Sequence, residues 1–218
     1  MYLGTFNWVG GKSKKLGWLV PLLEPPGITS FVDAFGGSAV VLLNRKKAKL
    51  EVYNDLDSRA VNFFRVLRDR HEELFQLLRC TPYAKEEFVL CKEESEDPLE
   101  DARRFFCSIS MSYSGTRTTF GHGTTSREGV PTPVEAHGFR VERLEKTPIV
   151  KRLMDVEIWH RPAIEVIGKF KEKEECLIYL DPPYDPSTWK TEHTKYHTPQ
   201  LSQEDHKEML AELVEAQC

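Results

Sequence analysis

The sequence predicts an α/β fold built on an open sheet, and three segments carry this prediction. Residues 176–180 are apolar and run into Asp181 and two prolines, which suits a strand that is buried on both faces and stops at the acid. Residues 28–32 are rich in β-branched and aromatic side chains and lead into a glycine turn. Residues 50–54 form a third such run and end at an acid. Because ligands of open α/β sheets bind at the carboxyl ends of the strands, these three ends form the candidate site.

Composition sets the broad class of the protein. The 218 residues suggest one domain, or one domain with a sizeable insertion. With 40% hydrophobic and 29% charged residues, the chain is expected to be soluble and globular, and its net charge of −4 does not by itself indicate a nucleic-acid binder. The five cysteines are odd in number and widely spaced, which argues against a disulfide framework or a zinc site. There is no secretory signal and no long apolar run, so we expect a cytoplasmic protein without a membrane span.

The N-terminal segment contains Gly10, Gly11 and Lys12 directly after Trp8. The order Gly-Gly-Lys-Ser suggests a phosphate-binding loop, but Phe6 stands where that motif needs its first glycine. A P-loop ATPase is therefore a weak alternative, which ATP hydrolysis dependent on Lys12 would revive. The segment is either a flexible basic loop or a place where the backbone, Trp8 and Lys12 approach a ligand closely.

The turn after the first predicted strand combines an acid with two glycines before an apolar helix that begins near Val40. Glycines in this position let the backbone pass close to a ligand, although tight turns of this kind also use glycine without one. The second strand ends at Asp55, about twenty residues later, where an acid suits the hydroxyls of a ribose. The two features together are a stronger signal than either alone.

Apolar periodicity predicts helices through the middle of the chain. Residues 58–78 read as an amphipathic helix broken near His71, and Thr81-Pro82 resembles the start of a helix that reaches about Glu94. A further helix is expected to begin at Asp97-Pro98. Its apolar face, which we assign to the core, holds Ala102, Phe105, Phe106 and Ile109. Later elements are predicted as a strand at 156–159, a helix at 163–170 and a final helix at 204–216 opened by Ser202.

Residues 112–133 differ from the rest because they are rich in glycine, threonine and serine. A loop this long without structure of its own is usually functional or disordered. Its arginines, Arg117 and Arg127, could grip phosphates or read guanine edges. The alternative is a mobile surface loop.

The motif Asp181-Pro182-Pro183-Tyr184 offers two fixed acceptors and a flat ring. The carboxylate of Asp181 and the carbonyl of Pro182 can accept hydrogens from an amino group, and the ring of Tyr184 can stack on a base. This combination suits the exocyclic amine of a nucleobase, whose lone pair is delocalised into the ring. The alternative is an ordinary proline turn with Tyr184 on the surface.

Taken together, these motifs resemble the S-adenosylmethionine-dependent DNA adenine-N6 methyltransferases, specifically their Dam-like alpha group. Residues 7–12 resemble the family's N-terminal cofactor motif and residues 33–38 its glycine-rich motif. Residues 53–55 resemble its ribose-binding acid and residues 181–184 its catalytic motif, and residues 196–198 resemble the segment beyond the catalytic loop. The resemblance covers most of the chain in the family's order.

The resemblance implies a Rossmann-like doubly wound methyltransferase sheet in which the first and fourth strands are neighbours. Asp33 and Asp181 would then meet at the point where the strand order reverses. It further implies that residues 1–69 and 150–218 form the catalytic domain. Residues 70–149 would form an inserted, mostly helical region that recognises the DNA target.

The resemblance also implies an adenine-specific DNA methyltransferase that uses S-adenosyl-L-methionine, acts on double-stranded DNA by direct methyl transfer to a flipped-out adenine and needs no metal. We expect a monomeric, bacterial or phage-encoded protein of the restriction-modification type. The expected catalytic residues are Asp181, Pro182, Pro183 and Tyr184, and the expected DNA-binding residues are Tyr113, Arg117 and Arg127. The expected cofactor-binding residues are Trp8, Gly10, Gly11, Lys12, Asp33, Phe35, Gly36, Gly37, Ser38, Asp55 and Asp181.

Two features depart from the family's pattern. Ala39 stands where members commonly have another glycine. The chain also ends where the family continues with three further strands, so the alternative is a truncated, catalytically impaired homologue that binds DNA or cofactor. A second alternative changes the acceptor to RNA adenine or to the N4 amine of cytosine.

Overall fold

The computed structural model describes residues 2–122, 130–183 and 201–214. The chain divides into two compact units. A sheet unit consists of residues 10–61 together with the chain from 155 onward, and a helical unit consists of residues 1–9 and 62–154.

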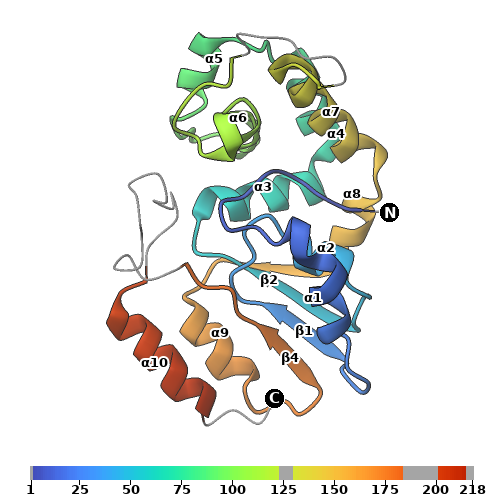
Figure 1. The fold of residues 1–218 in the computed structure, drawn as a ribbon, viewed down its shortest axis with the longest axis vertical. Coiled ribbons are helices and arrows are strands. Elements are labelled where there is room, and N and C mark those ends of the chain that lie inside the picture. Colours follow the sequence, from blue (N-terminus) through green and yellow to red (C-terminus); the bar gives the residue numbers. More distant parts are fainter. Residues whose placement is uncertain (1, 123–129, 184–200, 215–218) are drawn as a thin grey trace. The chain divides into compact units, whose positions relative to one another are not determined.

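The sheet unit is built on four parallel strands in the order β3-β2-β1-β4 within the described residues (Figure 1). The strands are β1 (Ser30–Asp33), β2 (Leu50–Asn54), β3 (Val156–Trp159) and β4 (Cys176–Tyr179). The chain leaves β1 toward β2 on one side, whereas β4 pairs with β1 on the other, with Asp33 opposite Tyr179. The strand order therefore reverses at β1, which confirms the prediction that the first and fourth strands are neighbours.

Two strands match their predicted limits, β2 and β3, and two differ. β1 begins at Ser30, two residues later than predicted, and β4 ends at Tyr179, two residues before the acid. The prediction that β4 is buried on both faces is wrong, because only Cys176 is fully buried and the next three residues are half-buried. Within the described residues β4 pairs only with β1, and an outer strand keeps one side open.

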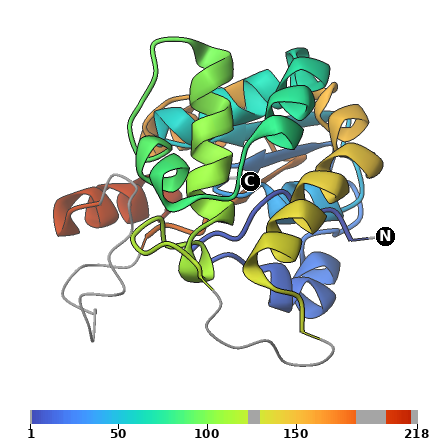
Figure 2. The same cartoon turned by 90° about the horizontal axis from the view of Figure 1, so that it is seen from above.

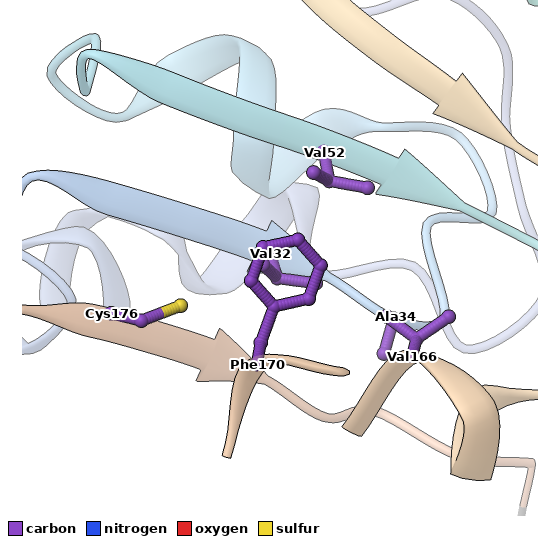
Figure 3. Close-up of a cluster of buried hydrophobic side chains, with 6 residues drawn as sticks. All are labelled: Val32, Ala34, Val52, Val166, Phe170 and Cys176. Atoms are coloured by element: carbon purple, nitrogen blue, oxygen red, sulfur yellow. The ribbon is translucent and has the colours of Figure 1, made fainter. Parts of the chain in front are cut away.

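One face of the sheet is covered by α9 (Ala163–Phe170). Val32 of β1, Ala34 directly after β1 and Val52 of β2 lie on this face, because side chains alternate along an extended chain. They pack with Val166 and Phe170 of α9 and with Cys176 (Figure 3). The other helical elements of the sheet unit are η1 (Ser13–Lys15), α1 (Leu16–Leu22), α2 (Val40–Asn44) and α10 (Gln203–Val214).

The helical unit is built around α6 (Pro98–Ser110), the light green helix in Figure 2. This helix contacts α4, α5 and α7. The unit also contains most of α3 (Ser58–Asp69), α4 (His71–Cys80), α5 (Lys85–Leu90), η2 (Tyr113–Gly115), α7 (Pro133–Lys146) and α8 (Ile149–Leu153). Its aromatic core contains Phe6, Trp8, Phe63, Phe64, Phe105 and Phe106. Phe105 and Phe106 are fully buried, as predicted.

The helix starts and stops follow local chemistry. The predicted break near His71 is confirmed, since α3 ends at Asp69 and α4 begins at His71. Asp97 caps α6 by accepting a hydrogen bond from Leu99 N, as expected of an acid before proline. The predicted helix start at Thr81 is wrong: Thr81 ends α4, its hydroxyl donates to Leu77 O at 2.8 Å, and α5 covers only Lys85–Leu90. The following proline holds Thr81 in an extended conformation, which delays the next helix.

A buried histidine makes the stability of the helical unit depend on pH. His137 of α7 is buried, and its Nδ1 lies 2.7 Å from Ser110 Oγ. Burial, and then the charge of Arg140, lowers the pKa of His137 from 6.5 to about 4. The folded state therefore binds fewer protons than the unfolded state between these values, so the free energy of unfolding should fall as the pH drops from 6.5 toward 4.

We expect His137→Gln to remove this pH dependence, which amounts to at most about 3 kcal/mol. The free energy of unfolding of wild type and variant should be compared by urea titration at several pH values between 4 and 7. The difference between the two proteins should change across this range, with the wild type losing more stability at the acidic end. Parallel pH profiles would show that His137 is not the titrating group.

No helix within the described ranges is both long enough and apolar enough to cross a membrane.

Candidate active site

The carboxyl ends of β1 and β4 bring two acids together. Asp33 is the last residue of β1 and is 1% exposed, and Asp181 follows β4 by two residues. The two strand ends are joined by a hydrogen bond from Ala34 N to Tyr179 O at 3.1 Å. Burial raises the pKa of Asp33 well above its usual range, and the charge of Asp181 is the next largest cause of this shift. The two acids, 148 positions apart in sequence, thus interact electrostatically at the reversal of strand order.

A lysine from the N-terminal glycine segment places a positive charge beside these acids. Lys12 Nζ donates to the carboxylate of Asp181 in an ion pair and to Gly10 O at 2.9 Å. The positive charge also lowers the pKa of Asp33, although by less than burial and the neighbouring acids raise it. Gly10 has φ 79°, a left-handed conformation that glycine adopts without steric cost. The predicted cofactor residues Gly10 and Lys12 are therefore held beside the predicted catalytic acid.

One oxygen of Asp33 has no hydrogen-bond partner. Oδ1 is buried and unpaired within the described part of the chain, whereas the carboxyl group accepts a hydrogen bond from the backbone of Phe35. Leaving a buried acceptor unpaired is costly in free energy, so such an atom indicates a position where a donor from a ligand can bind. Asp33 thus presents an acceptor that the described residues do not use.

The glycine turn that follows Asp33 is fastened to the end of β2. Gly36 N donates to Asn54 O at 2.7 Å, and Tyr53 Oη donates to Gly37 O at 2.9 Å. Gly36 has no room for a side chain, since an added Cβ would lie 2.1 Å from the ring of Tyr53. The turn ends at Ala39, which has φ 55°. This left-handed conformation explains why a glycine would suit position 39.

Asp55 holds the same turn from the other strand. Its carboxylate accepts hydrogen bonds from Gly37 N at 2.7 Å and from Asp57 N at 2.8 Å, and the residue is buried. Burial raises the pKa of Asp55 to about 6, although the backbone donors act against this shift. Because each carboxylate oxygen has two lone pairs, these bonds leave capacity for a further donor. Asp57 instead caps α3, accepting from Arg59 N and Ala60 N.

The structure adds Asn54 to the site; this residue lies in the 53–55 motif but is not among the expected cofactor-binding residues. Its side chain donates to Ala34 O and Arg161 O, both at 3.0 Å, and accepts from Arg161 N at 3.0 Å. One amide thus connects the carboxyl ends of β1, β2 and β3. A polar residue at the last position of a predicted buried strand is the signal that could have identified it.

The remaining predicted cofactor residues fall into two groups. Phe35 is half-buried and packs against the sheet core, Ser38 is buried in the turn, and Gly11 is exposed beside Lys12. Trp8 belongs to the helical unit, where its ring lies 5.5 Å from that of Phe6 and 6.1 Å from that of Phe105.

The predicted catalytic and DNA-binding residues are only partly described. Pro182 and Pro183 are half-buried directly after Asp181, whereas Tyr184, Arg127 and residues 196–198 lie outside the described residues. Tyr113 is 72% exposed. The guanidinium of Arg117 lies over the rings of Trp8 and Phe105, at 5.6 and 5.4 Å from their centroids. Among the described residues no group of three or more His, Cys, Asp or Glu side chains could hold a metal ion.

Comparison with known proteins identifies a family and a relative. The family described as D12 class N6 adenine-specific DNA methyltransferase matches residues 8–217. Modification methylase StsI of Streptococcus sanguinis is 44% identical over 59 residues. This segment covers 27% of the chain but only 9% of the length of that relative.

Proposed function

The chain belongs to the D12 class family of N6 adenine-specific DNA methyltransferases, and from this premise we propose that it transfers a methyl group from S-adenosylmethionine to the exocyclic N6 of adenine in double-stranded DNA. The observation that carries the proposal is the position of Asp181. This acid follows β4 at the reversal of strand order, beside the buried Asp33 and in an ion pair with Lys12.

Asp181 and Pro182 would prepare the nucleophile. The amine of adenine is a poor nucleophile while its lone pair is delocalised into the ring. Hydrogen bonds from the amino hydrogens to the Asp181 carboxylate and to the Pro182 carbonyl would localise that lone pair on nitrogen. Asp181 would also accept the proton that the nitrogen loses, and Tyr184 would stack on the base. Holding the reacting groups at near-attack distance can supply roughly 7–11 kcal/mol of the barrier.

The described residues fit the proposed cofactor. When bound, S-adenosylmethionine supplies an electrophilic methyl group on a cationic sulfur. The unpaired Oδ1 of Asp33 can accept a hydrogen bond from its ammonium group, and Asp55 has lone pairs left for ribose hydroxyls. The cationic cofactor would also relieve the repulsion between Asp33 and its neighbouring acids. The full proposed set is Trp8, Gly10, Gly11, Lys12, Asp33, Phe35, Gly36, Gly37, Ser38, Asp55 and Asp181.

We assign DNA recognition to the region 70–149, most of which is helical in the described residues. The target adenine would have to leave the base stack, at a cost of a few kcal/mol, before Asp181 could hold its amine. Tyr113, Arg117 and Arg127 are the proposed contacts in this region. We further propose a monomeric cytoplasmic enzyme of a restriction-modification system, a role suggested by its similarity to a segment of modification methylase StsI.

The proposal is tested by incubating the protein with methyl-labelled S-adenosylmethionine and unmethylated duplex DNA, followed by digestion to nucleosides. We expect the label in N6-methyladenine. Parallel reactions with RNA and with cytosine-containing DNA that lacks adenine test the alternative acceptors. Label in either of these instead, or cofactor binding without any transfer, would contradict the proposal, and the latter result would identify an impaired homologue.

Removing the charge of Lys12 should slow methyl transfer. We expect Lys12→Met to lower kcat by about ten- to a hundredfold, because the carboxylate of Asp181 loses the partner that fixes its position. Lys12→Arg should recover part of the rate. The matched control is Lys14→Met, which changes an exposed lysine two residues away and should leave the rate unchanged. Equal rates for Lys12→Met and Lys14→Met would refute the positioning role.

A further inference from the structure

The segment between α6 and residue 121 forms a closed loop in the helical unit, which we call the neck loop (residues 112–121). Gly121 N donates to Met111 O at 2.7 Å, so the end of the loop returns to its start. Inside this closure Ser112 and Phe120 form an antiparallel bridge, and Tyr113 N donates to Thr119 O at 2.9 Å. The loop therefore has a defined backbone shape.

That shape is strained at its tip. Ser114, Gly115 and Arg117 have φ values of 54°, 76° and 58°, so three of four consecutive positions are left-handed and two of them are not glycine. Backbone of this kind is unfavourable for residues with side chains and persists only where surrounding contacts hold it. Such strain tends to occur at functional sites.

Several contacts hold the tip in place. Ser112 Oγ accepts a hydrogen bond from Arg117 N at 3.1 Å, and the Arg117 guanidinium lies against the rings of Trp8 and Phe105. Gly115 is pressed against the N-terminal segment, where an added Cβ would lie 2.8 Å from Asn7 O. Arg117 thus helps to hold the loop in this shape through its backbone and its side chain.

Tyr83, between α4 and α5, holds the two ends of the neck loop together. Its hydroxyl donates to Gly121 O and lies 3.4 Å from Met111 O, so one phenol reaches both carbonyls at the base of the loop. Its ring packs against Phe120 with a centroid distance of 5.1 Å. An added Cβ on Gly121 would lie 3.1 Å from Met111 O and 3.2 Å from the Tyr83 hydroxyl. Tyr83 is separated from Gly121 by 38 positions, so only the folded chain reveals this contact.

The outer surface of the neck loop suits a nucleic acid. Tyr113 is 72% exposed, and Ser114, Thr118 and Thr119 of the same loop are also exposed. The loop contains no Asp or Glu, so it presents an aromatic ring and hydroxyl groups without repelling phosphate. Hydroxyl side chains are common donors to phosphates and base edges.

We propose that Tyr83 is a positioning residue that holds the neck loop in the shape that docks into duplex DNA. The proposal rests on the proposed function, since it assigns the loop a part in binding the same substrate. Tyr83 does not touch DNA itself. It acts by restricting the loop to the docking shape, so that binding costs less conformational entropy.

The test compares wild type with Tyr83→Phe, which keeps the ring against Phe120 but removes the hydroxyl. We expect KM for duplex DNA to rise by about three- to tenfold, the effect of one hydrogen bond. Both kcat and the Kd for S-adenosylmethionine should stay unchanged. Gly121→Ala, which crowds the same hydroxyl and the Met111 carbonyl at the base of the loop, should act in the same direction. Tyr2→Phe, which removes a phenol hydroxyl from a tyrosine that lies against Arg143, is the matched control and should have no effect.

A second measurement reports the flexibility of the neck loop directly. Trypsin should cleave after Arg117 faster in Tyr83→Phe than in wild type, and the Kd for a fluorescent duplex should rise by the same factor as KM. These two measurements need no methyl transfer, so they keep the proposal testable if the wild type proves inactive. A fall in kcat or cofactor affinity at constant KM, or unchanged cleavage and DNA affinity, would overturn the positioning role.

Discussion

Asp181→Ala should lower methyl incorporation into N6-methyladenine by about a thousandfold or more, the largest effect that we expect on activity. The carboxylate is the proposed acceptor for the amine, and no other described side chain beside it can replace it: Asp33 is buried, and Lys12 carries only donors. The variant should still fold, because removing Asp181 relieves the repulsion that it exerts on Asp33. Label incorporation and thermal unfolding should be measured on the same preparations.

The matched control for this variant is Asp155→Ala. Asp155 belongs to the same sheet unit and also pairs with a lysine, Lys47, but on the exposed surface. Exposed ion pairs contribute little to stability, so Asp155→Ala should keep both fold and activity. Asp181→Asn adds a finer comparison, since the amide keeps one acceptor oxygen but cannot take the proton. Substantial transfer by Asp181→Ala would mean that another group activates the amine.

The sequence predicted best where local pattern and burial agree. Residues 50–54 form a strand at its predicted limits, with four buried residues at a central position of the parallel sheet. Residues 156–159 also match their predicted limits, and there buried Val156 and Ile158 alternate with exposed Glu157. Helical spacing alone predicts that Phe105 and Phe106 lie in the core, and both are fully buried. The adjacency of the first and fourth strands came from the family resemblance, since no local pattern states which strands pair.

What the sequence missed depends on contacts between distant positions. The ion pair between Lys12 and Asp181 spans 169 positions, and the amide of Asn54 bonds to Arg161, 107 positions away. The predicted helix start at Thr81 is wrong because the same dipeptide occurs at both ends of helices. A threonine before proline can open a helix, but it can also end one, as Thr81 ends α4. The charge of Arg117 predicts a contact with DNA, but the sequence does not show that its guanidinium also lies over two aromatic rings of its own unit.

Gly36→Ala should destabilise the sheet unit by about 3 kcal/mol, at the upper end of the cost of overpacking, or prevent its folding. The added Cβ would lie 2.1 Å from Cε2 of Tyr53, which is fully buried and bonded through its hydroxyl to Gly37 O, so the ring cannot move away without losing that bond. The controls are Gly17→Ala in α1 and Gly168→Ala in α9, where an added Cβ meets nothing within 4 Å. Both controls should be neutral or slightly stabilising, since alanine favours helix. Urea unfolding of the three variants measures the difference.

A double variant decides whether the ring of Tyr53 is the cause. Tyr53→Leu removes the ring and should cost stability by itself, through lost packing and the lost bond to Gly37 O. If the ring is what excludes a side chain at position 36, Gly36→Ala should lower the free energy of unfolding much less in the Tyr53→Leu background than in wild type. The coupling free energy between the two substitutions should be at least about 1 kcal/mol. Additive effects would place the strain elsewhere in the turn. Coupling would mean that the close packing of Gly36 against Tyr53 fixes the backbone of the turn. That backbone places Gly37 N where it donates to Asp55. The stability of the sheet and the shape of the proposed cofactor site would then depend on the same contact.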